Sequence, residues 1–136
     1  IMSNNSIHVK KDGKLDIGFR TWAGSKHHVV SGNVIRVEPD GKMGLAMDIR
    51  GTETTITSNS IHNMQGDSLP LKITAGNAVV TGNIFEYVTL TVDDPAESPK
   101  PVSIRNNVLE NSTVVVIAGN VNQNSTESNV EHASPE

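Results

Sequence analysis

One six-residue pattern of hydrophobic and polar positions returns five times along the chain. An apolar residue is followed by any residue, a small residue or Asn, an Asn, any residue and a second apolar residue. The five copies span Met2–Ile7, Val30–Ile35, Ile56–Ile61, Val80–Phe85 and Ile104–Leu109. Their recurring asparagines are Asn5, Asn33, Asn59, Asn83 and Asn107, with successive spacings of 28, 26, 24 and 24. A repeat of this length indicates a solenoid of stacked units.

Between these copies lie runs in which every second residue is apolar. The runs are Leu15–Phe19, Leu45–Ile49, Leu69–Ile73 and Val88–Val92. Such alternation is typical of a strand with one buried and one solvated face. The offset between the second and third runs is the same as the spacing that separates Asn59 from Asn83. Each repeat therefore predicts two or three short strands joined by turns rich in Gly, Asn or Pro.

A unit of this size made of short strands cannot close a core alone and must stack on its neighbours. No ten-residue stretch has the 3.6-residue period of a helix, and the Leu-x-x-Leu-x-Leu spacing of leucine-rich repeats is missing. The sequence predicts an all-β fold, a right-handed single-stranded parallel β-helix of about five coils. We expect residues 1–117 to form the coils and the polar residues 118–136 to form a tail or cap.

Composition and charge narrow the possible partners. Hydrophobic residues make up 35% and aromatic residues 3% of the chain, which disfavours a helical bundle or a sandwich built on large side chains. The net charge is −4 and no run of Lys or Arg forms a patch, so we expect no nucleic-acid partner. No segment approaches the roughly 20 apolar residues of a membrane span, so no membrane partner is expected either. The chain has no cysteine, and we predict no metal and no cofactor.

The small-Asn pair within Val-x-Gly-Asn-x-Ile, seen at Val30–Ile35 and closely at Val80–Phe85, resembles the pectate-lyase-like family of parallel β-helices. That family includes polysaccharide lyases and hydrolases and the tailspike and appendage proteins of bacteriophages. The resemblance covers residues 1–117. It implies part of a virion or extracellular protein that contacts bacterial surface polysaccharide, either as a receptor-binding element or as a depolymerase. The alternative is a structural or adhesive shaft without chemistry of its own.

The five recurring asparagines are predicted to be structural. An amide at a tight turn can adopt the left-handed conformation and bond backbone groups of adjacent coils. A buried amide is tolerated only when its hydrogen bonds are satisfied, and stacking asparagines from coil to coil provides this. We therefore expect a buried ladder of Asn5, Asn33, Asn59, Asn83 and Asn107.

The position three residues after each ladder asparagine is polar in every repeat. It is occupied by His8, Arg36, His62, Glu86 and Glu110. These side chains should face outward, with neighbours about 5 Å apart on successive coils. His62 and Glu86 form a candidate acid/base pair, because a His titrates near neutrality. Both are also candidate saccharide-binding residues. The alternative is a solvated row of charges with weak pairing.

A second outward stripe follows the alternating strands. It comprises Asp16, Arg20, Asp48, Arg50, Lys72, Thr74, Thr89 and Thr91, flanked by Glu53 and Asp67. In the enzymes that the repeat resembles, a groove along such a face holds the saccharide, which makes Arg50 and Lys72 candidate binding residues. Asp48 and Asp67 are candidates for the paired carboxylates of glycoside hydrolysis. Asp48 beside Arg50 could instead serve a lyase, with a metal-bound acid and an Arg base.

The sequence lacks catalytic signatures of the enzymes that the repeat resembles. The paired-aspartate signature of the pectin hydrolases and the clustered calcium ligands of the pectate lyases are both absent from this sequence.

Trp22, the one tryptophan, is a candidate binding residue. It could stack on a sugar ring or could simply pack locally.

The run Val114–Ile117 is apolar at four consecutive positions. A strand exposed on one side would alternate, so this run should be covered on both faces. The polar tail or a neighbouring subunit could cover the outer face. By resemblance to phage tailspikes, we expect a homo-oligomer, namely a trimer.

Overall fold

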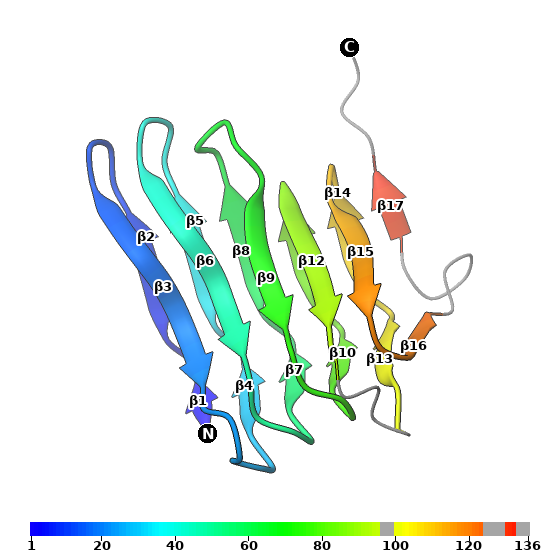
Figure 1. Ribbon diagram of the computed structural model, residues 1–136. Coiled ribbons are helices and arrows are strands. Elements are labelled where there is room, and N and C mark those ends of the chain that lie inside the picture. The colour runs from blue at the N-terminus through cyan, green and yellow to red at the C-terminus, as the bar shows by residue number, and fades with distance from the viewer. Residues whose placement is uncertain (96–99, 124–129, 133–136) are drawn as a thin grey trace.

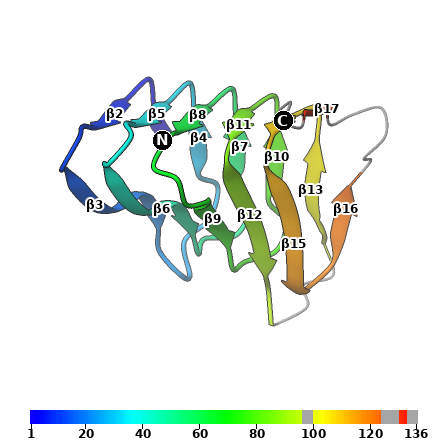
Figure 2. The ribbon, with the colours of Figure 1, turned by 90° about the horizontal axis from the view of Figure 1, so that it is seen from above.

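The computed structural model describes residues 1–95, 100–123 and 130–132, and it confirms the predicted parallel β-helix (Figure 1). Within these residues every regular element is a strand. The strands form three parallel sheets, and successive coils lie side by side along the axis of the solenoid. Figure 2 shows this succession from β3 at one end to β15 near the other.

Each of the first five coils contributes one strand to each sheet, and sheets A and B each contain one further strand. Sheet A contains β1 (Met2–Ser3), β4 (Val29–Ser31), β7 (Thr55–Thr57), β10 (Val79–Thr81), β13 (Val102–Arg105) and β16 (Val121–Gln123). Sheet B contains β2 (Ser6–Val9), β5 (Val34–Val37), β8 (Ser60–Asn63), β11 (Ile84–Glu86), β14 (Val108–Glu110) and β17 (Val130–His132). Sheet C contains β3 (Lys14–Thr21), β6 (Lys42–Ile49), β9 (Leu69–Ile73), β12 (Val88–Asp93) and β15 (Thr113–Ala118).

The core consists of apolar side chains stacked in rows along the solenoid. One row in sheet A joins Val30, Ile56, Val80 and Ile104, and one row in sheet B joins Ile35, Ile61, Phe85 and Leu109. All eight side chains are at most 1% exposed. These are the two apolar positions of the repeated pattern, so the pattern marks the inward faces of sheets A and B. Their burial supplies the main driving force for stacking.

The three corners of a coil differ in how much length they accept. The corner between sheets A and B contains two residues in each of the first five coils. The corner between sheets B and C ranges from five residues (64–68) to the single residue Tyr87. This shortest corner brings Val88 into register with Leu69, a shorter step along the chain than the steps between β10 and β13 in sheet A and between β11 and β14 in sheet B, which keep the ladder spacing.

The asparagine ladder is confirmed, and it occupies the short corner between sheets A and B. The carboxamide oxygen of Asn83 accepts from the backbone N–H of Asn59 at 2.9 Å and from its Nδ2 at 3.0 Å. Nδ2 of Asn83 donates to the Ile56 carbonyl at 2.9 Å and to Oδ1 of Asn107 at 3.0 Å. The same contacts link Asn5 to Asn33 and Asn33 to Asn59. Asn5, on the first coil, is exposed, whereas the other four are buried.

The left-handed conformation falls on a different residue from the one we expected. It belongs to the residue just before each ladder asparagine: Asn4, Gly32, Ser58, Gly82 and Asn106 have φ between 57° and 69°. This explains the preference for a small residue or Asn there, because glycine and asparagine adopt positive φ at low cost. The ladder asparagine is left free to point its amide into the stack.

The predicted tail contributes two further strands. β16 pairs with β13 in sheet A, and β17 pairs with β14 in sheet B. Part of the predicted tail or cap, residues 124–129 and 133–136, lies outside the described residues.

Replacing Asn83 with Ala tests the ladder. The variant removes the acceptor of the Asn59 N–H and the donor to the Ile56 carbonyl inside a closed structure. Because buried groups then lose their partners, the free energy of unfolding should fall by about 1–3 kcal/mol in urea denaturation. Asn122→Ala, at an exposed position on β16, is the matched control and should change it by less than about 0.5 kcal/mol. Equal stability of the two variants would contradict a structural role.

Candidate functional site

Four charged side chains meet on the outer face of sheet C, and we call them the basic cluster: Arg20, Asp48, Arg50 and Lys72. Arg20 lies beside Asp48, and Asp48 beside Lys72, on successive strands β3, β6 and β9. Nε of Arg20 is 3.0 Å from Oδ2 of Asp48, and Nε and Nη2 of Arg50 are 3.0 and 2.9 Å from the same oxygen. The cluster carries three cations against one carboxylate, in a chain whose net charge is −4.

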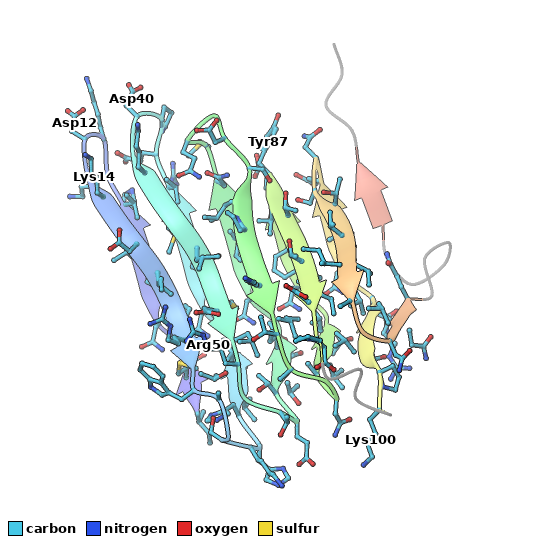
Figure 3. The ribbon with its side chains drawn as sticks, viewed as in Figure 1. Asp12, Lys14, Asp40, Arg50, Tyr87 and Lys100 are labelled. Carbon is cyan, nitrogen blue, oxygen red and sulfur yellow. The ribbon has the colours of Figure 1, made fainter. Side chains whose placement is uncertain are left out.

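The corner after β6 is fixed by a side chain of the preceding coil. The hydroxyl of Thr21, which is buried, accepts hydrogen bonds from the backbone N–H groups of Arg50 at 3.0 Å and Gly51 at 2.9 Å. This contact holds the backbone from which the Arg50 side chain reaches back to Asp48. Figure 3 labels Arg50 near the lower end of sheet C and Lys14 at its opposite end.

Asp48 is not the solvated groove carboxylate that we expected. Its side chain is only 4% exposed, because Arg20 and Arg50 bind it from two sides. Both guanidinium groups bind the same oxygen, Oδ2, which is therefore occupied by protein donors. Asp48 therefore acts as a counter-ion that arranges the two arginines.

Asp48 and Asp67 are not brought together as a catalytic pair. Asp48 is in register with Lys72, while Asp67 lies before the start of β9 at Leu69. The three steps along the backbone from Leu69 to Lys72 already cover about 10 Å at the rise of a strand, and Asp67 lies two residues further back. Paired carboxyl groups in glycosidases are about 5–9.5 Å apart, so this backbone placement gives the pair no support.

Trp22 follows β3 directly and is 65% exposed. The guanidinium carbon of Arg20 lies 5.4 Å from the centroid of its ring, the range of a cation–π contact. The loop after it is closed by Ser25, whose backbone N–H and hydroxyl both donate to the Trp22 carbonyl. An open aromatic face therefore stands next to the basic cluster.

The outward row on sheet B is also formed as predicted. His8, Arg36, His62, Glu86 and Glu110 occupy successive strands in register. Nδ1 of His62 lies 3.0 Å from Oε2 of Glu86, which confirms the predicted contact. Nε2 of the same ring lies 2.9 Å from the hydroxyl of Ser60, a residue that the sequence reasoning did not single out. The available signal was the sequence Asn-Ser-Ile-His, which occurs both at 5–8 and at 59–62.

The equivalent histidine of the first coil has a different partner. Nε2 of His8 lies 2.9 Å from Oε1 of Glu38, which follows β5. The pKa of Glu38 lies below its ordinary value because the Lys11 backbone N–H donates to its carboxylate. The His8 hydrogen bond and the charges of His8 and Arg36 act on that pKa in the same direction.

Three further features bear on other kinds of site. Among the described residues, no three His, Asp or Glu side chains are grouped so that they could hold a metal ion. No helix long and apolar enough to cross a membrane is found in the described part of the chain. A shallow pocket lies at the corner between sheets B and C, lined by Asn63, Met64, Gly66 and Tyr87, the last of which is labelled in Figure 3.

Comparison with known proteins gives no relative: no protein-family model, no curated protein and no solved structure matches this chain. Function therefore has to be inferred from the side chains that the coils bring together.

The counter-ion role of Asp48 can be tested with Asp48→Asn. The change keeps the shape but removes the charge that two arginines share, so the free energy of unfolding should fall by about 1–3 kcal/mol. Asp67→Asn, at an exposed carboxylate before β9, is the control and should have an effect below about 0.5 kcal/mol. Chemical denaturation measures both. If Asp48→Asn left the free energy of unfolding unchanged, the two arginines would not depend on this carboxylate.

Proposed function

We propose that this chain is part of a virion or extracellular β-helix protein that binds an anionic polysaccharide of a bacterial surface. The binding face is the outer side of sheet C at Arg20, Arg50 and Lys72, with Trp22 at its edge. The observation that carries the proposal is the excess of two positive charges in the basic cluster of an otherwise acidic chain.

The geometry suits an extended, acidic chain of sugars. Arg20 on β3 and Lys72 on β9 lie two strand spacings of about 4.8 Å apart, and Arg50 follows β6, the strand between them, so one ligand can touch several coils. Arg20 and Arg50 are 32% and 42% exposed, so their remaining N–H donors can reach carboxylate or sulfate groups of a ligand. The open ring of Trp22 offers the apolar surface on which a sugar ring stacks.

The proposal is binding rather than depolymerisation. Asp48 is committed to two arginines and Asp67 is separated from it, so the hydrolytic pair suggested by the sequence has no geometric support. The alternative function is a structural or adhesive shaft. It is favoured by the same arginine contacts, since a charged cluster that satisfies itself can serve stability alone.

Binding to alginate, a polymer of uronates, distinguishes the two functions. We expect alginate to bind and neutral dextran not to bind in titration calorimetry at low salt. Lys72→Ala and Trp22→Ala should each weaken alginate binding about five- to tenfold, or about 1 kcal/mol, without unfolding the protein. The control is Lys14→Ala, a lysine at the opposite end of sheet C (Figure 3). Absence of alginate binding by the intact chain would favour the shaft.

We further propose that the apolar end of the solenoid is covered by other copies of this chain, forming a trimer like the tailspikes that the repeat resembles. β15 is the last strand of sheet C. Val116 continues the buried row of Val92 but is 48% exposed, and Val115 and Ile117 are 43% and 65% exposed. Contiguous apolar surface of this kind marks a contact site.

Sedimentation at micromolar concentration tests this assembly. The chain should sediment as a trimer, and the double variant Val115→Ser, Ile117→Ser should shift it towards monomer because it removes apolar area from the contact. Met64→Ser, at an apolar residue 37% exposed in another corner, should leave the trimer intact. A monomeric parent chain would refute the oligomer.

A further inference from the structure

The side chains of Ser60, His62 and Glu86 form a continuous hydrogen-bonded relay on sheet B. The Ser60 hydroxyl lies 2.9 Å from Nε2 of His62, and Nδ1 of His62 lies 3.0 Å from Oε2 of Glu86. Serine hydrolases of unrelated folds use this order of groups, which is recognised by geometry and not by sequence position. We propose that Ser60 is the nucleophile of an acyl-ester hydrolase site, distinct from the basic cluster.

The direction of the protons follows from the chemistry of the three groups. An ionised carboxylate can only accept, so a neutral His62 carries its proton on Nδ1 and donates it to Glu86. Nε2 then has a free lone pair, and the Ser60 hydroxyl donates to it. His62 is therefore held in the tautomer that removes a proton from Ser60, and Glu86 orients the ring.

The relay is open to a substrate. The side chains of His62 and Glu86 are 44% and 29% exposed. Ser60 lies in register between Val34 and Ile84, each 43% exposed, which provide apolar surface on both sides of the hydroxyl for an acyl group. A small acyl ester, such as an acetate ester of an alcohol or sugar, fits such a shallow apolar surface.

An electrophilic group must stabilise the oxyanion of the reaction, and the backbone N–H of the nucleophile does not supply it. The N–H of Ser60 already donates to the Asn33 carbonyl at 2.9 Å. Arg36 is exposed and lies in register with His62 on the opposite side from Glu86, one strand spacing of about 4.8 Å away. Arg36 carries the permanent positive charge of this row, so we assign to it the stabilisation of the oxyanion.

The reaction has two balanced halves. The Ser60 oxygen attacks the ester carbonyl carbon as its proton passes to Nε2 of His62, and the same proton then leaves with the alcohol when the C–O bond of the ester breaks. Water attacks the resulting acyl-serine and gives a proton to His62. That proton returns to the Ser60 oxygen when the carboxylic acid departs.

The first coil provides an internal control. Ser6 and His8 repeat the sequence Ser-Ile-His on the same face, but the next residue in the row of His8 is Arg36 in place of a glutamate. Nε2 of His8 faces Glu38. The same Ser-x-His spacing therefore lacks the glutamate of the next coil that completes the relay, and Ser6 should be inert.

Covalent labelling with a fluorophosphonate, located by mass spectrometry of the full chain, tests the nucleophile. We expect modification of Ser60 and none of Ser6. Hydrolysis of p-nitrophenyl acetate should fall about tenfold or more in Ser60→Ala and in His62→Gln, and less in Arg36→Ala. Ser6→Ala and His8→Gln should keep the parent rate, which corrects for simple imidazole catalysis.

Glu86→Gln separates a positioning role from a structural one. Glutamine keeps the shape but donates as well as accepts, so the rate at neutral pH should fall while the circular dichroism spectrum and thermal midpoint stay at the parent values. Absence of Ser60 labelling, or equal hydrolysis by the Ser60→Ala variant and the parent, would overturn the proposal. Neither outcome depends on alginate binding, so the two sites are tested independently.

Discussion

The fold depends on hydrogen bonds that run between coils, and the asparagine ladder concentrates them at one corner. Asn59, Asn83 and Asn107 each donate to a backbone carbonyl of the coil before, and bonds between their amides join Asn59 to Asn83 and Asn83 to Asn107. A single coil buries too little apolar area to fold alone, so the ladder has value only when neighbours are present. Stability is thereby cooperative along the axis. The row geometry that follows places side chains of distant sequence position within about 5 Å of each other.

That row geometry explains both candidate sites. Sheet C brings Arg20, Asp48 and Lys72 together although each belongs to a different coil. Sheet B brings Ser60 and His62 of one coil against Glu86 of the next. On each sheet, a side chain has neighbours along its own strand and neighbours on the strands of the adjacent coils. A candidate site forms where suitable residues occupy such neighbouring positions on the outer face of a sheet.

The fold could be predicted from the sequence because its signal repeats. The Asn spacing and the flanking apolar residues identify the inward rows, and Ile61 and Phe85 are buried in register as the pattern requires. Individual environments could not be predicted in the same way. The burial of Asp48 depends on how two arginines pack around it, and a repeat pattern carries no information about that packing. Ser60 was missed because the sequence pattern pairs His62 with Glu86 but does not say what the second ring nitrogen contacts. In the structure, one ring nitrogen faces Glu86 and the other faces the Ser60 hydroxyl.

The unequal corners have a consequence for how such a chain can change over evolutionary time. The corner between sheets A and B has a constant length in the first five coils, whereas the other two corners vary from coil to coil. Insertions and deletions can therefore be accommodated at the other two corners of a coil, where they do not disturb the asparagine ladder. A whole coil, such as that from Asn59 to Asn83, could be duplicated or lost as a block. The protein can gain or lose coils and acquire new loops while the asparagine ladder is retained.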